Sequence, residues 1–284
     1  MKFRKCEASA FCTVCLTWNN PGDIQNPMNH HSRRDFLASA AALATAAASK
    51  ATFAATPAAP LRVQYTTGSH TVPIQQYAMF DDYRFRDLDT WILPHPHPFD
   101  TINGAPGRPG PDVVVLGDYV TGNWPETDRP PLLKFLESGK GLVVLHHAVG
   151  DNQDWPYWFQ EVLGGGLVQT VESQKWTGHH SGLRQFPRQH ITPVGDHPIS
   201  RNIQPFLLPR DELFTDMWFS PKAVPLLRSD DKNLSDNGTI AWLGVHPKAR
   251  VVCFQAGHTD WVNQDPTYRK IVHNMILWAA GRLA

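Results

Sequence analysis

Cysteine is scarce in this sequence, and neither sign of charge is in excess. Three of the four cysteines fall within the first 15 residues, and the rest of the chain keeps only Cys253, which excludes an internal disulfide bond there. Lysine plus arginine and aspartate plus glutamate number 26 each, so the formal net charge is zero. Proteins that bind duplex nucleic acid usually present a basic face, because neutralising phosphates supplies much of their affinity. Nucleic acid is therefore not an expected partner.

Several catalytic and cofactor motifs are also missing. The chain has no GxSxG nucleophile elbow, no P-loop and no GxGxxG after its first predicted strand. The HExxH zinc motif is absent, and the histidine pairs at 146–147 and 179–180 are adjacent instead of four residues apart. Cys12 and Cys15 form a CxxC pair without a second pair, which is a weak indication of a redox or metal site.

The N-terminal part of the chain has the pattern of an export signal. Residues 32–38 read SRRDFLA, and an alanine-rich apolar run follows from 39 to 48. Adjacent arginines before a mildly apolar stretch are typical of the twin-arginine signal. The run is too short and too weakly apolar to span a bilayer permanently. The alternative interpretation is a basic cap on an ordinary alanine-rich helix.

This pattern divides the chain into three parts. We predict an upstream extension at 1–27, with Met28 as a candidate start of translation. A twin-arginine signal peptide is predicted at 28–55 and the mature domain at 56–284. The mature protein is then expected in the periplasm or outside the cell, without a membrane-spanning segment.

Apolar strands alternate with helices along the mature chain. Continuous β-branched runs such as 112–116 suit strands that are buried on both faces of a parallel sheet. The segment 93–111 is dense in proline and glycine and predicts a long surface loop. The alternation predicts a single α/β domain with a mostly parallel sheet. Strands are predicted at 61–66, 112–116, 141–145, 213–214, 224–227, 240–243 and 250–254, and helices at 130–138, 155–163 and 266–283.

Each of four predicted strands is followed by a polar residue within four positions. His70, the pair at 146–147 and His258 come after three of them, and Asp118 comes after a fourth. Ligands of open parallel sheets bind in the crevice beyond the carboxyl ends of the strands. We therefore expect these side chains to line one site. Further candidates lie between the strands, and they are His179, His180, Asp211, Glu212 and Trp242.

Two kinds of chemistry fit such a set of residues. The first is a divalent metal such as zinc, held by ligands from separate strand ends; the candidates are His70, His146, His179 and His258. Neighbouring residues on a strand point to opposite faces, so His146 and His147 can share an ion only if the turn bends sharply. In the second, the imidazoles bind a polar ligand or exchange protons near neutral pH.

Motifs in a fixed order connect the chain to a known family. Taken together from about 61 to 283, they resemble the ThuA-like (trehalose utilisation) family. The motifs are 112–116 (DVVVL), 139–148 (GKGLVVLHHA), Trp155 with Tyr157, 163–165 (LGG), 197–199 (HPI), 211–214 (DELF), 250–252 (RVV), 257–258 (GH) and 278–281 (WAAG).

The resemblance implies a flavodoxin-like three-layer domain, related to class I glutamine amidotransferases and linked to sugar utilisation. Amidotransferases carry a nucleophilic cysteine at the turn that here holds the histidine pair 146–147, so glutamine hydrolysis is not expected. The chain departs from the family in its proline-rich loop and in its doubled histidines. Five residues match recurring positions of the family, and they are His70, His146, Asp211, Glu212 and His258.

We therefore expect an exported protein that acts on a small-molecule carbohydrate. The leading hypothesis is a hydrolase, lyase or isomerase of a glycoside or keto-sugar, with His146, His258 and Glu212 as catalytic residues. The alternative is a non-catalytic sugar- or metal-binding module, and a homo-oligomer is compatible with either. Substrate binding is expected from His70, Asp118, His147, His180, Asp211 and Trp242.

Overall fold

The computed structural model describes residues 59–67, 74–94, 99–117 and 123–284. The predicted extension at 1–27 and the predicted signal peptide at 28–55 lie outside these residues, as do His70 and Asp118. Among the described residues, none of the helices combines the length and the apolar character that a membrane crossing requires.

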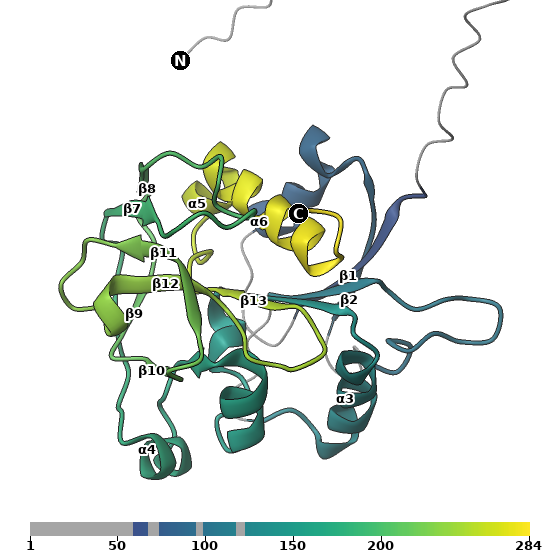
Figure 1. The fold of residues 1–284 in the computed structure, drawn as a ribbon, viewed down its shortest axis with the longest axis horizontal. Coiled ribbons are helices and arrows are strands. Elements are labelled where there is room, and N and C mark those ends of the chain that lie inside the picture. Colours follow the sequence, from purple (N-terminus) through teal and green to yellow (C-terminus); the bar gives the residue numbers. More distant parts are fainter. Residues whose placement is uncertain (1–58, 68–73, 95–98, 118–122) are drawn as a thin grey trace, which may run out of the picture. The chain divides into compact units, whose positions relative to one another are not determined.

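A nine-stranded mixed sheet forms the centre of the described part, in the order β2-β1-β3-β4-β13-β12-β11-β7-β8 (Figure 1). The first five strands in this order run parallel to one another, and each later strand pairs antiparallel to its neighbour. The predicted α/β class is confirmed. The strands are β1 (Leu61–Thr67), β2 (Leu88–Pro94), β3 (Val113–Leu116), β4 (Gly141–Leu145), β7 (Gln189–Pro193), β8 (Phe206–Leu208), β11 (Val224–Ser229), β12 (Thr239–Leu243) and β13 (Val251–Phe254).

Helices cover both faces of this sheet, with α5 and α6 on one side and α3 on the other (Figure 1). The helices are α2 (Ile74–Ala78), α3 (Arg129–Glu137), α4 (Val171–Thr177), α5 (Asp260–Gln264) and α6 (Pro266–Ala279). Short 3₁₀ turns are η1 (Met79–Asp81), η2 (Tyr83–Phe85), η3 (Glu126–Asp128), η4 (His146–Gly150) and η6 (Asp236–Gly238), and η5 (Trp158–Leu163) is a π-helix. Two small sheets pair β5 (Gly165–Gly166) with β10 (Trp218–Phe219) and β6 (Gly182–Arg184) with β9 (Leu213–Thr215).

The apolar runs of the sequence become strands because both of their faces are buried. Side chains alternate between the two faces of a strand. In β4, Val143 and Leu145 belong to the same core cluster as Ile271 of α6. Leu142 and Val144 belong to the opposite cluster, which includes the apolar face of α3. Such two-sided burial is what a central parallel strand requires.

The helix boundaries follow from capping residues. Asp265 begins α6, because its side chain accepts the N–H groups of Thr267 and Tyr268. The first residue of a helix has no acceptor for its N–H within the helix. Proline, which has no N–H, therefore suits the first position of α6. The predicted helix at 155–163 becomes η5 over its last six residues and ends at Gly164, whose φ is +68°. The segment 93–111 is only partly a loop, since its first residues complete β2.

The pairing of β4 with β13 sets the position of the candidate site. These neighbours run parallel, with Leu145 opposite Phe254. The residues that follow both strands therefore leave the sheet at the same edge, although they are far apart in sequence.

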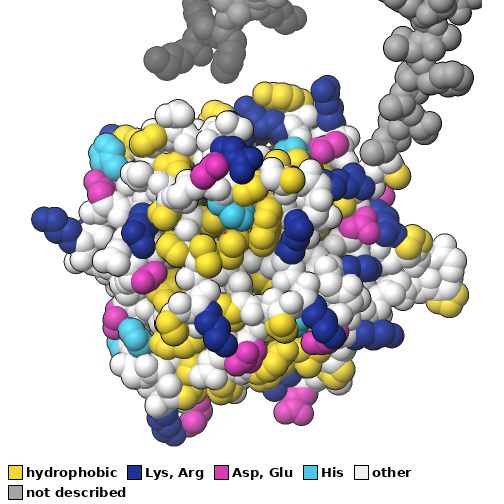
Figure 2. All heavy atoms as spheres, in the orientation of Figure 1, with side chains coloured by type: hydrophobic (Ala, Val, Ile, Leu, Met, Phe, Trp, Pro, Cys, Tyr) yellow, Lys and Arg dark blue, Asp and Glu magenta, His cyan; other side chains and the backbone are white. Residues whose placement is uncertain are grey.

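On the visible face of the molecule, acidic and basic side chains are interspersed, in agreement with the zero net charge (Figure 2).

Candidate functional site

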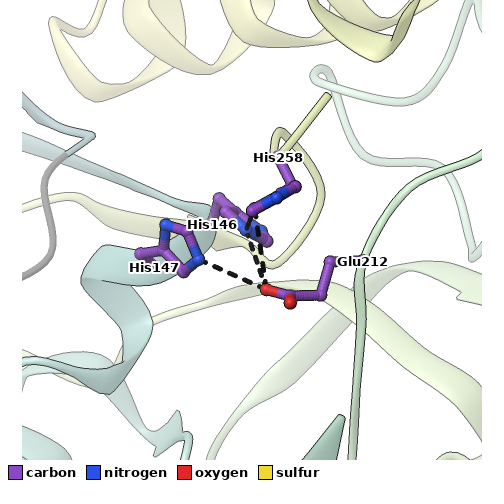
Figure 3. Close-up of side chains that lie close together, drawn as sticks. All are labelled: His146, His147, Glu212 and His258. Carbon is purple, nitrogen blue, oxygen red and sulfur yellow. Dashed lines mark hydrogen bonds and ion pairs between the residues drawn. The ribbon is translucent and has the colours of Figure 1, made fainter. Parts of the chain in front are cut away.

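Four side chains meet beyond the carboxyl ends of β4 and β13: His146, His147, Glu212 and His258 (Figure 3). Each offers one atom that could bind a metal, and these four atoms all lie within 4.8 Å of one another. We call these residues the His₃Glu cluster. The structure thus brings together the three residues predicted to be catalytic and adds His147 to them.

The backbone bends sharply as soon as β4 ends. His146 has a φ of +46°, in the left-handed region that residues other than glycine rarely adopt. This bend begins η4 and turns both imidazoles to one side, so that the ring centroids of His146 and His147 are 3.9 Å apart. From the sequence, His146 and His147 could share an ion only if the turn after the strand bends sharply. That bend is present, and the two rings lie in one cluster.

His146 is buried, and a main-chain hydrogen bond fixes its tautomer. Its Nδ1 lies 2.7 Å from the carbonyl oxygen of Gln255. Because a carbonyl can only accept, the proton of the neutral ring is on Nδ1, and Nε2 carries a lone pair. Burial lowers the pKa of His146, against the opposing effect of Glu212, and favours this neutral form. The ring also stacks on Phe214, with centroids 5.0 Å apart.

The Glu212 carboxylate faces all three imidazoles. Its Oε2 lies 3.2 Å from Nε2 of His147, 3.4 Å from Nε2 of His146 and 3.7 Å from Nδ1 of His258. Burial by itself raises the pKa of Glu212, but the facing imidazoles of His146 and His147 outweigh burial and hold that pKa well below its usual range. The side chain is therefore a carboxylate at neutral pH.

Asp211, next to Glu212, binds the main chain of the loop that carries His258 and does not belong to the cluster itself. Its fully buried carboxylate accepts the N–H of Gly257 through Oδ2 at 2.7 Å and the N–H of Thr259 through Oδ1 at 3.0 Å. These two groups flank His258, so Asp211 fixes the loop that carries it. Burial raises the pKa of Asp211 to about 6, although both N–H groups oppose that rise. Both of its oxygens are occupied by the main chain, and binding of substrate by Asp211 stays an untested prediction.

The loop after β13 depends on a glycine. Gly257 has a φ of +137°, and a Cβ at this position would lie 2.6 Å from Oη of Tyr268. Only glycine fits both the backbone conformation and the space. Asn263 of α5 completes the loop by donating to the carbonyl oxygens of Gly257 at 2.8 Å and Thr259 at 2.9 Å.

The His₃Glu cluster has the composition and spacing of a zinc-type site. Imidazole nitrogen and carboxylate oxygen are ordinary zinc ligands, at about 2.0–2.2 Å from the metal, which places neighbouring ligands of a tetrahedral ion roughly 3.3–3.6 Å apart. Four of the separations between donor atoms are 3.1 to 3.7 Å. The bond from His146 to Gln255 is the kind of outer contact that orients a metal-binding histidine. The residues therefore fit a divalent ion.

Three further candidates within the described residues lie apart from this cluster, and they are His179, His180 and Trp242. His179 follows α4, and its Nδ1 contacts Oδ1 of Asp216 at 3.2 Å, while His180 is exposed. Neither belongs to the set that could share a metal with His146. Trp242 is fully buried in β12, and its indole N–H donates to the carbonyl of Leu163. The ring is part of the core, and binding of substrate by Trp242 stays an untested prediction.

Sequence reasoning missed Gln255, which connects two parts of the site. Its main-chain carbonyl accepts from His146, and its side-chain oxygen accepts the N–H of Phe214 in β9 at 3.0 Å. It thereby ties the small sheet that follows Glu212 to the end of β13. A buried glutamine directly after an apolar strand is the sequence signal that could have identified it.

Comparison with known proteins places the chain in a family. A search of the curated proteins finds no match. Among solved structures, a putative ThuA-like protein from Parabacteroides merdae ATCC 43184 is 16% identical, with a TM-score of 0.65 over 79% of this chain and 92% of that one. A second, from Bacteroides uniformis ATCC 8492, is also 16% identical, with a TM-score of 0.57 over 78% and 92%. A cytoplasmic protein from Salmonella typhimurium LT2 is 11% identical, with a TM-score of 0.51 over 77% and 99%.

Identities this low show a shared fold and nothing more specific. The family assignment comes from a family model described as ThuA, trehalose utilisation, which matches residues 111–279. This match spans more than half of the chain and includes every member of the His₃Glu cluster. The protein belongs to the ThuA (trehalose utilisation) family.

Proposed function

We propose that this protein is a metal-dependent enzyme that acts on a carbohydrate, with a divalent ion held by the His₃Glu cluster. One observation carries the proposal. Nε2 of His146 and Oε2 of Glu212 lie 3.4 Å apart, and the four donor atoms of the cluster lie within 4.8 Å of one another, close enough to bind one ion together. A divalent cation satisfies both groups and the two remaining imidazoles together. The family's description, trehalose utilisation, supports a sugar as the substrate.

Each residue of the cluster contributes a distinct property. A bound divalent ion polarises oxygen atoms of a ligand and lowers the pKa of water. His146 is held in one tautomer by Gln255, and Glu212 supplies the negative charge that offsets the ion. His258 has the most exposed ring of the three, with 27% of its side chain accessible, and so faces the space from which a substrate approaches. This geometry favours hydrolysis, elimination or isomerisation at a sugar oxygen or carbonyl.

Metal analysis tests the proposal directly. Protein purified without chelator and reconstituted with Zn²⁺ should retain about one ion per chain. His258→Ala should lose it, whereas His179→Ala, which removes a histidine outside the cluster, should keep it. A folded wild-type protein that retains no ion after exposure to Zn²⁺, Mn²⁺ and Co²⁺ would overturn the proposal.

Turnover is the second readout. The metal-loaded protein should convert a member of a panel of glycosides and keto-glycosides, and chelation or His258→Ala should abolish the conversion. Tight binding of a sugar without product over long incubation would instead identify a non-catalytic sugar-binding module on the same fold.

Export by the twin-arginine route is the remaining part of the proposed function. It rests on the sequence SRRDFLA at 32–38 and the apolar run at 39–48. Replacing Arg33 and Arg34 by lysine should retain the protein in the cytoplasm, as fractionation of an expressing bacterium would show. Equal distribution of the wild type and the double variant would contradict the proposal.

A further inference from the structure

Two adjoining hollows extend outward from the His₃Glu cluster. The inner hollow, of about 470 Å³, is lined by Phe186, Arg210, His258, Thr259, Asp260 and Trp261. The outer hollow, of about 610 Å³, shares Arg210 and Trp261 with it and continues to Arg188 and Gln264. Both volumes fall within the roughly 300–1,000 Å³ that small-molecule sites occupy. A ligand that enters here meets the cluster at His258.

Trp261 presents an aromatic surface to both hollows. Its exposed fraction is 60%, and it is the only tryptophan among the large exposed apolar residues of the described part. The backbone that carries this ring is fixed, because α5 begins at the Thr259 cap and the hydroxyl of Thr259 donates to the carbonyl of Arg210 at 2.8 Å. An exposed indole offers a flat apolar face to the C–H groups of a sugar ring.

Phe186 lies on the inner hollow as a second aromatic residue. It is exposed, its φ is +57°, and its ring centroid lies 6.2 Å from that of His258. A bulky residue with a positive φ is an outlier that persists only where the surroundings impose it, and such outliers gather at ligand sites. The inner hollow therefore combines two aromatic rings with one member of the cluster.

Two arginines give the outer hollow its charge. Arg188 and Arg210 are exposed, and within the part of the chain that the structure describes neither forms an ion pair with a carboxylate. Asp260, which also lines the inner hollow, accepts the N–H of Gln75 through Oδ1 at 3.3 Å. Arg210 lines both hollows and Arg188 lines the outer one, so an anionic group of a ligand has guanidinium partners beside and beyond His258. Guanidinium groups suit carboxylate and phosphate because they bind both in a bidentate manner.

We propose that these hollows form a substrate subsite for an anionic sugar. A sugar ring stacks on Trp261 next to His258, and its carboxylate or phosphate group binds Arg210 and Arg188. This inference rests on the proposed function, because it names the substrate class of the same site.

Binding measured on the metal-loaded protein tests the subsite. The probes are methyl glucuronide for a carboxylate, glucose 6-phosphate for a phosphate and methyl glucoside as the neutral reference, compared by saturation-transfer NMR and calorimetry. At least one anionic probe should bind about tenfold more tightly than methyl glucoside, and the probe that does so identifies the anion. Equal affinity for all three probes would overturn the proposal.

Variants of the lining residues test whether the anionic probe binds in these hollows. Trp261→Ala and the double variant Arg188→Ala/Arg210→Ala should each weaken the preferred anionic probe by about tenfold, and Trp261→Phe should recover part of the loss. Tyr83→Ala, which removes another exposed aromatic residue, should leave affinity unchanged. Metal content is measured on every variant. Full metal content with unchanged affinity in Trp261→Ala overturns the subsite alone, whereas failure of the metal assay on the wild type overturns the proposed function.

Discussion

The Nδ1 atom of His146 lies 2.7 Å from the carbonyl oxygen of Gln255, and this bond joins the end of β4 to the end of β13. It keeps the Nε2 lone pair of His146 directed at Glu212 and His258. Because the acceptor is a main-chain oxygen, replacing the side chain of Gln255 does not remove it. The expected pH dependence of metal binding follows from the neutral state of this ring.

Metal affinity should fall as the pH is lowered. Burial lowers the pKa of His146, so this ring is neutral over the physiological range. A metal competes with protons for imidazole nitrogen, and acidification below about 6.5, the ordinary value for histidine, adds protons that the ion must displace. We expect Zn²⁺ affinity, measured by chelator competition from pH 5.5 to 8, to rise with pH and then level off. Affinity that is constant over this range would contradict the assignment of the ligands.

Asp211→Asn should weaken both the fold and the site. Asparagine offers one acceptor oxygen where aspartate offers two, and its amide group would face the N–H of either Gly257 or Thr259. A buried N–H left without a partner costs about 1–3 kcal/mol, and disturbed outer contacts lower metal affinity about 10- to 100-fold. Urea unfolding and zinc titration measure the two effects. Asp196→Asn, at an exposed aspartate, is the control, and equal behaviour of the two variants would count against a positioning role.

Gly257→Ala should displace His258. The added Cβ would meet Oη of Tyr268 at 2.6 Å on a backbone with a φ of +137°. We expect loss of zinc retention together with a lower midpoint of unfolding. Gly195→Ala is a matched control, since its φ is +64° but a Cβ there has nothing within 4 Å.

Removing the clashing oxygen provides a second check on the same position. In the double variant Gly257→Ala/Tyr268→Phe, Oη is gone, and part of the zinc retention should return. Absence of any recovery would indicate that the backbone conformation alone accounts for the loss.

Asp82→Asn should reduce stability at neutral pH and have little effect in acid. Burial by itself raises the pKa of Asp82, but the N–H of Arg84 and the guanidinium groups of Arg269 and Arg84 hold it below its usual value. A depressed folded-state pKa contributes stability above the unfolded value of 3.8 and loses it as the pH falls through the folded value. The expected difference in unfolding free energy is roughly 1 kcal/mol at pH 7. It should shrink as the pH falls below 3.8, and a difference as large in acid as at pH 7 would refute the explanation.

Part of the candidate site could be predicted from the sequence because of a simple property of parallel sheets. Strands that run the same way end at the same edge, so His146 and His258 were expected together, and the structure confirms this. Glu212 was expected from its position before a short strand. That strand, β9, pairs with β6 instead of joining the large sheet, and it reaches the cluster through the contact between Phe214 and Gln255.

The remaining differences come from conformations and burial that local pattern does not encode. Strand alternation separates His146 from His147, and only the positive φ of His146 brings the rings together. Trp242 was assigned to binding, but it lies on a face of β12 that packs into the core. β2 was predicted in part as loop, since proline and glycine dominate the residues that follow it.

The link between His146 and His258 also sets when the site can come into existence. The two histidines are separated by 112 positions along the chain, and they meet only after β13 has inserted beside β4. A growing polypeptide that has not yet reached His258 contains two of the imidazoles and the carboxylate of the cluster but no enclosure for an ion. The proposed metal site is therefore complete only after β13 has paired with β4, and ion retention would report that the central strand of the sheet is in place.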